Sequence, residues 1–79
     1  MRTNKFSHSG TDVALTLPNT YLGNHIKGQL IRASTSVGCN YRAACLGQSK
    51  KAFVAKLSIV SEEADECIFW VKYAIDRGL

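Results

Sequence analysis

Long apolar runs, paired cysteines and proline are all scarce in this sequence, and each scarcity excludes a class of protein. Every long apolar stretch is interrupted by Lys, Arg, Asp or Glu, so no segment offers the roughly 20 apolar residues that a membrane-spanning helix needs. The basic first residues are not followed by the apolar run, roughly seven residues or longer, of a secretory signal. We therefore expect a cytoplasmic protein that does not cross a membrane.

The sequence has three cysteines, an odd number, and their spacing does not suit a shared metal or redox site. Cys39, Cys45 and Cys67 include no pair with the two-residue spacing typical of zinc and redox sites. We expect neither a disulfide framework nor a metal site, and no motif indicates a cofactor.

The bulk composition indicates one small folded domain over residues 1–79. A hydrophobic content of 46% with a single proline and six glycines argues against disorder. A chain this short buries a smaller share of its surface than a mid-sized domain, so its stability is expected to be marginal.

Charge is divided unevenly along the chain. Residues 1–61 hold eight Lys or Arg against the single acid Asp12, a net +7, whereas residues 62–79 hold two basic residues against five acids, a net −3. Such asymmetry suits a polyanionic partner or head-to-tail contacts between copies, and a solvated face is the plain alternative.

Residues 1–20 give the weakest structural signal. The segment Ser7–Thr11 has loop-like composition, and residues 12–17 are too few for a stable isolated helix. Pro18 disfavours helix at Leu17, and Asn19 or Thr20 suits the cap of a following helix.

Helical spacing dominates the rest of the chain and predicts an all-α fold. Over residues 21–46 the apolar positions recur at alternating steps of four and three, with a polar residue, Asn40, in one core position and a break near Gly38 as the alternative. Over residues 49–77 the same repeat is stricter, and Ser49 and Gly78 suit its two ends. The repeat in the first segment comprises Ile26, Leu30, Ala33, Val37 and Ala44, and the repeat in the second comprises Phe53, Leu57, Val60, Ala64, Cys67, Val71 and Ala74.

Two long helices joined by a short turn form an antiparallel hairpin, which cannot cover both of its own apolar stripes. Phe69, Trp70 and Tyr73 lie one turn apart and largely outside the main stripe, where a solvated helix carries polar residues. We interpret these three as a subunit interface, with packing inside one chain as the alternative.

Five basic residues form a candidate nucleic-acid surface. Lys50 and Lys51 open the second helix, where positive charge opposes the helix dipole and a bound phosphate would relieve that opposition. The aromatic residues do not alternate with these cations, so we expect binding to the RNA or DNA backbone rather than to bases. The five candidates are Arg32, Arg42, Lys50, Lys51 and Lys56.

The acidic run from Glu62 to Glu66 carries no catalytic signature. Paired carboxylates act as acid and base, or hold a metal, only with further ligands, and neither histidine shares a helical face with them. A solvated face is the preferred interpretation, and Glu63 can instead form a structural ion pair with Arg32. We expect a protein that is not an enzyme.

Two motifs in order resemble a known family. Several segments resemble the second and third helices of the four-helix-bundle family related to proteins encoded in 23S ribosomal RNA intervening sequences. They are Gln29–Ala33 and Ser36–Arg42 for the second helix, and Ser49–Phe53, Lys56–Ile59, Glu63–Glu66 and Trp70–Val71 for the third. The resemblance implies that residues 34–38 stay helical, that Asn40 is a structural polar residue between helices, and that copies assemble into a ring-like pentamer.

The same resemblance also identifies departures. The family's long first helix is shortened and broken here around Gly10 and Pro18, an acid common in the family is replaced by Ala43, and the family's fourth helix is missing. The fold class we predict is therefore an all-α antiparallel hairpin from an incomplete up-down four-helix bundle. The function we predict is a non-enzymatic homo-oligomeric bundle protein that binds RNA or DNA; the alternatives are a protein-interaction module or a truncated remnant without independent function.

Overall fold

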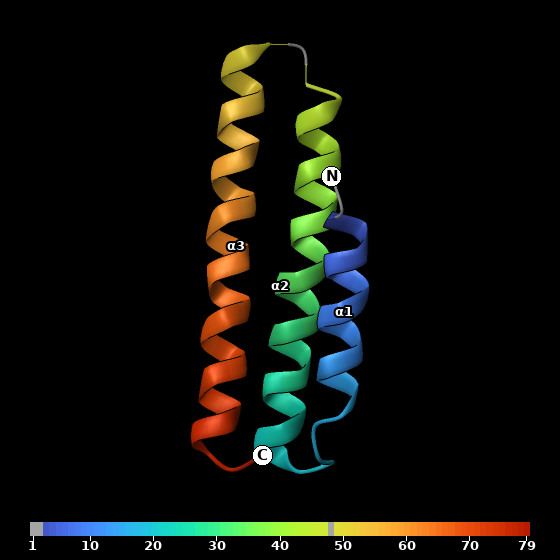
Figure 1. Ribbon diagram of the computed structural model, residues 1–79, viewed down its shortest axis with the longest axis vertical. Coiled ribbons are helices and arrows are strands. Elements are labelled where there is room, and N and C mark those ends of the chain that lie inside the picture. Colours follow the sequence, from blue (N-terminus) through green and yellow to red (C-terminus); the bar gives the residue numbers. More distant parts are fainter. Residues whose placement is uncertain (1–2, 48) are drawn as a thin grey trace.

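The computed structural model describes residues 3–47 and 49–79 and is helical throughout its regular structure. Helix α1 spans Thr3–Leu15, α2 spans Tyr21–Cys45 and α3 spans Lys50–Asp76, and the described residues include no strand. The three helices lie side by side, with α1 and α3 both packed on α2 and the chain reversing direction at each connection (Figure 1). None of these helices is long and apolar enough to cross a membrane.

Helix α1 corrects the expectation of a loop at residues 7–11, because tertiary contacts supply what the local sequence lacks. The Ser7 hydroxyl donates a hydrogen bond of 2.6 Å to the carbonyl oxygen of Ser34, and Ala14 is fully buried. Gly10 permits the close approach: a Cβ at this position would lie 2.4 Å from the Cβ of Ser34. Residues 1 and 2 of the stretch expected to be weak lie outside the described residues.

Helix α2 is continuous, so the alternative break near Gly38 is wrong. The N–H of Gly23 donates to Thr20 Oγ1 at 3.0 Å, which satisfies one of the free N–H groups at the helix start. The apolar stripe read from the sequence is confirmed as core, since each of its members is at most 3% exposed: Ile26, Leu30, Ala33, Val37 and Ala44.

Helix α3 begins and ends with the expected caps but buries less of its stripe. The N–H of Ala52 donates to Ser49 Oγ at 3.1 Å, and Gly78 adopts a φ of 76° just beyond the last turn. Only three residues of α3 are buried: Val60, Cys67 and Ala74. Their seven-residue spacing marks the line along which α3 rests on α2.

Candidate functional site: an apolar groove and a basic tip

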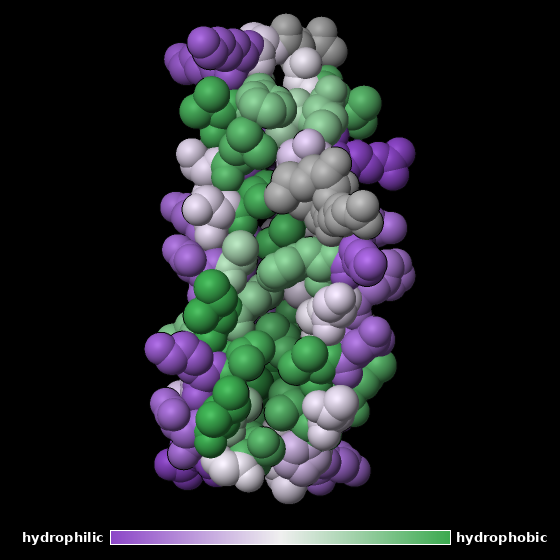
Figure 2. Space-filling model, viewed as in Figure 1, coloured by the Kyte–Doolittle hydropathy of each residue, from purple (hydrophilic) through white to green (hydrophobic). Residues whose placement is uncertain are grey.

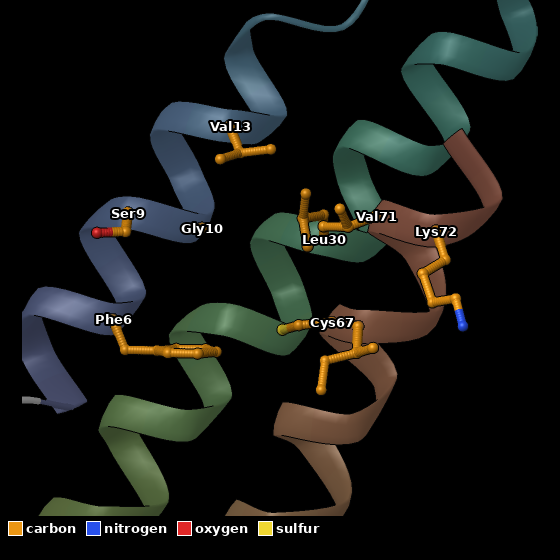
Figure 3. Close-up of a pocket in the computed structure, with 9 residues that line it drawn as sticks. Phe6, Ser9, Gly10, Val13, Leu30, Cys67, Val71 and Lys72 are labelled. Atoms are coloured by element: carbon orange, nitrogen blue, oxygen red, sulfur yellow. The ribbon is translucent and has the colours of Figure 1, made fainter. Parts of the chain in front are cut away.

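An apolar groove lies between α1 and α3, above α2. Leu30 and Cys67 form its floor, and Phe6 and Val13 of α1 face Val71 of α3 across it (Figure 3). Its volume is about 280 Å³, and its remaining lining residues are Ser9, Gly10, Ile68 and Lys72. The ammonium group of Lys72 points away from the hollow, so the groove presents apolar atoms to whatever fills it.

The groove continues towards the C-terminal end of α3. A second hollow of about 110 Å³ shares Val13, Leu30 and Val71 with the first and extends to Leu79. Figure 2 shows the result as an apolar band along the long axis of the molecule, bordered by hydrophilic residues on both sides. Ile68 and Ile75, on the α3 edge of this band, are 57% and 67% exposed.

The thiol of Cys67 contributes to the apolar character of the floor. Burial raises the pKa of the Cys67 thiol, and the nearby carboxylates of Glu63 and Glu66 raise it further. The raised pKa keeps the thiol protonated at neutral pH, so it behaves as a small apolar side chain rather than as a nucleophile.

The three aromatic candidates divide between two environments. Phe69 and Tyr73 are 56% and 37% exposed and stack on each other with ring centroids 5.9 Å apart. Trp70 is half-buried against the core; its ring meets the edge of His25 at 5.6 Å and its Nε1 donates to Glu66 Oε2 at 3.2 Å. Trp70 thus makes contacts within its own chain, and the interface role predicted for Phe69, Trp70 and Tyr73 stays a prediction.

Two carboxylates of the acidic run meet Arg32 of α2. Arg32 Nη1 lies 3.0 Å from Glu63 Oε2, the pairing offered in the sequence analysis, and Nη2 pairs with Glu66. The Arg32 guanidinium, helped by the Trp70 indole, lowers the pKa of the Glu66 carboxyl. In the described part of the chain, no three His, Cys, Asp or Glu side chains lie close enough together to hold a metal ion.

The five basic candidates separate into four and one. Arg42 lies in the last turn of α2, Lys50 and Lys51 open α3, and Lys56 follows, so these four exposed residues flank the α2–α3 connection at one end of the molecule (Figure 1). We call this end the basic tip. Arg32 lies elsewhere, on the middle of α2, with its charge compensated by two carboxylates; both ion pairs found among the described residues are its own.

Asn40 makes contacts inside its own helix. Its Nδ2 donates to the carbonyl oxygen and to the hydroxyl of Ser36, each at 2.9 Å, and the residue is half-buried. The role between helices that the family resemblance implies for Asn40 stays a prediction.

Sequence reasoning missed the groove between α1 and α3. Val54, Ile68 and Ile75 each directly follow a member of the α3 stripe and stay exposed, and the position of α1 depends on the contact of Gly10 with Ser34, which no periodic pattern shows.

Comparisons with protein-family models, curated proteins and solved structures find no match to this chain. The relationship to ribosomal intervening-sequence proteins accordingly rests on the sequence motifs alone and stays a prediction.

Proposed function

We propose that this protein is a non-enzymatic helical-bundle protein whose task is to associate with further copies of itself. In this proposal α1, α2 and α3 occupy three positions of an up-down four-helix bundle, and the groove is the fourth. The observation that carries the proposal is the groove itself: an apolar hollow between α1 and α3 that is open to solvent on one side and extends to Leu79.

Solvent exposure of this channel favours association because apolar surface gains about 25 cal/mol per Å² when it leaves water. Along the groove and on the adjacent outer face of α3, the side chains of Val54, Ile68, Phe69 and Ile75 are each more than half exposed. Exposed apolar surface that is continuous, rather than scattered, marks an interaction site.

The test is the solution mass measured by light scattering across a wide concentration range, with circular dichroism on the same samples. The proposal predicts one defined multimer with high helix content. A helical monomer at every concentration would contradict it, and so would a polydisperse aggregate without a fixed stoichiometry.

Nucleic-acid binding at the basic tip is a second candidate, favoured by one observation. Residues 38–61 include four cations and no acid, and Lys50 and Lys51 occupy the first turn of α3, whose dipole they oppose. A phosphate bound there would offset that opposition and contact the free N–H groups of the helix start.

The second candidate is tested by replacing Arg42, Lys50 and Lys51 together with Glu. RNA affinity should fall and become less dependent on salt, by a slope change of roughly 0.7 to 0.9 per lost phosphate contact. The matched control is Lys27→Glu on α2, away from the tip. Equal affinity and equal salt slope in the triple variant and the control would rule out binding at the tip.

A further inference from the structure

The open edge of α3 carries a complete seam for a second helix. Besides the line that rests on α2, a second set of positions follows alternating steps of three and four, the spacing of a coiled-coil seam. This seam comprises Val54, Leu57, Ser61, Ala64, Ile68, Val71 and Ile75, and none of the seven is buried. It runs beside the groove through Ile68, Val71 and Ile75 and continues past it to Val54, near the basic tip.

The solvent-exposed area of the chain exceeds that of a compact monomer by about the area that one partner buries in a protein interface. The chain exposes 5414 Å², whereas a compact monomer of 8.7 kDa exposes about 4,700 Å². The surplus of about 700 Å² is close to the roughly 800 Å² that each partner buries in a standard protein interface.

The distribution of charge along the chain favours a second copy as the partner, lying in the opposite direction. The segment that includes the basic tip, residues 38–61, carries four cations and no acid, and residues 62–76 carry five acids and Lys72. Two of those acids, Glu63 and Glu66, already pair with Arg32 of the same chain, which leaves Glu62, Asp65 and Asp76 for a partner. Two copies side by side in opposite directions place each basic tip beside the acidic half of the other, whereas parallel copies place like charges together.

We propose that a second copy of this chain covers the groove as an antiparallel, two-fold partner, with the two α3 helices side by side along this seam. Ser61 and Ala64 lie near the middle of the seam, where small side chains let two helices approach closely. The larger residues at the N-terminal end of one seam then contact the larger residues at the C-terminal end of the partner's seam. This inference rests on the self-association proposed above and adds its surface and its direction.

The surface is tested with Ile68→Glu, which places a charge on the exposed edge of the groove, and with Ala55→Glu as the matched control on an exposed position of α3 outside the seam. We expect Ile68→Glu to raise the dissociation constant by at least about tenfold, with unchanged helix content, and Ala55→Glu to leave it unchanged. If Ile68→Glu assembles as tightly as the unaltered protein, the groove is not the interface, although self-association itself stands.

The direction is tested by exchanging charges between the two ends of α3. One variant carries Lys50→Glu and Lys51→Glu, a second carries Asp76→Lys, and a third carries all three changes. Lys50 and Asp76 are about 39 Å apart along their own helix, so they cannot compensate each other within one copy. The end changes at Lys50, Lys51 and Asp76 also favour the helix dipole, which keeps loss of fold from imitating loss of assembly.

We expect each of the first two variants to dissociate about tenfold more readily at low salt, and the third to recover most of that loss. Recovery supports the antiparallel pair. A third variant that stays as weak as the first two, or an assembly whose mass is not that of two chains, overturns it. If the unaltered protein is a monomer throughout, the proposed function fails as well.

Discussion

Helices α2 and α3 carry apolar stripes of similar regularity, yet they differ in how much of each stripe is covered. In α2 every apolar member of the stripe is buried, because α1 and α3 pack on it from two sides. In α3 only Val60, Cys67 and Ala74 are buried, because a single helix packs on it. Periodicity therefore reports which face of a helix is apolar, and the number of neighbouring helices decides how much of that face leaves water.

The largest expected effect is a difference in stability loss between a substitution in the α2 stripe and one on the exposed edge of α3. Leu30→Ala, at a side chain 2% exposed, should lower the free energy of unfolding by about 2–5 kcal/mol, because it removes buried methyl groups and leaves a cavity. Ile68→Ala, at a side chain 57% exposed, should change it by less than about 0.5 kcal/mol when measured at a concentration where the chain is monomeric. Urea denaturation of both variants checks the contrast, and equal losses would show that α3 is covered on both sides.

A smaller effect distinguishes a packed glycine from an open one within the helices. Gly10→Ala should lower the free energy of unfolding by about 1–3 kcal/mol, because the added Cβ meets Ser34 and α1 must move. Gly28→Ala in α2 is the matched control, since a Cβ there meets nothing within 4 Å. Helix propensity alone predicts a gain of up to about 1 kcal/mol at Gly28. Thermal unfolding of the two variants should shift in opposite directions; a shared sign would contradict the close contact of α1 with α2.

The smallest effect concerns the ion pair that joins α2 to α3. Arg32→Gln should lower the free energy of unfolding by less than about 1 kcal/mol at neutral pH, because the Arg32 side chain is 50% exposed and its pairs are screened by solvent. The lowered pKa of Glu66 stabilises the fold above its ordinary value of 4.5, and this contribution disappears as the pH falls through the lowered value.

Replacing Arg32 should therefore make the loss of stability in acid shallower below about pH 4.5, as measured by denaturation at a series of pH values. Lys27→Gln on the same helix is the control and should leave the acid limb unchanged. An identical acid limb in the Arg32 variant would mean that Glu66 does not depend on the arginine.

The sequence predicted the two long helices well because their information is local and repeated. The expected limits of 21–46 and 49–77 differ by one residue from the observed ends at Cys45, Lys50 and Asp76, since capping residues and stripes recur within a few turns. Helix α1 was missed because its stability comes from residues distant in sequence: Ser7 bonds Ser34 and Ala14 is buried against α2. A 13-residue helix with two serines and a glycine gives no comparable local signal.

The candidate site was predicted in part. Four cations do gather at one end, because Arg42 and Lys50 flank the same short connection, and a connection is readable from sequence. The compensation of Arg32 by two carboxylates depends on the register of α2 against α3, which spacing within one helix does not supply. The groove was beyond reach for the same reason, since it exists only where α1 and α3 face each other across α2.

The contact between Gly10 and Ser34 sets how closely α1 approaches α2 beside the groove. Because Gly10 has no Cβ, α1 rests here directly on the Ser34 side chain, which lets the two helices approach closely. Any larger residue at position 10 acts as a spacer that tilts α1 and changes the gap between α1 and α3. Gly10 thus sets the width of the groove, and substitutions at this one position offer a simple way to change which helix the groove accepts.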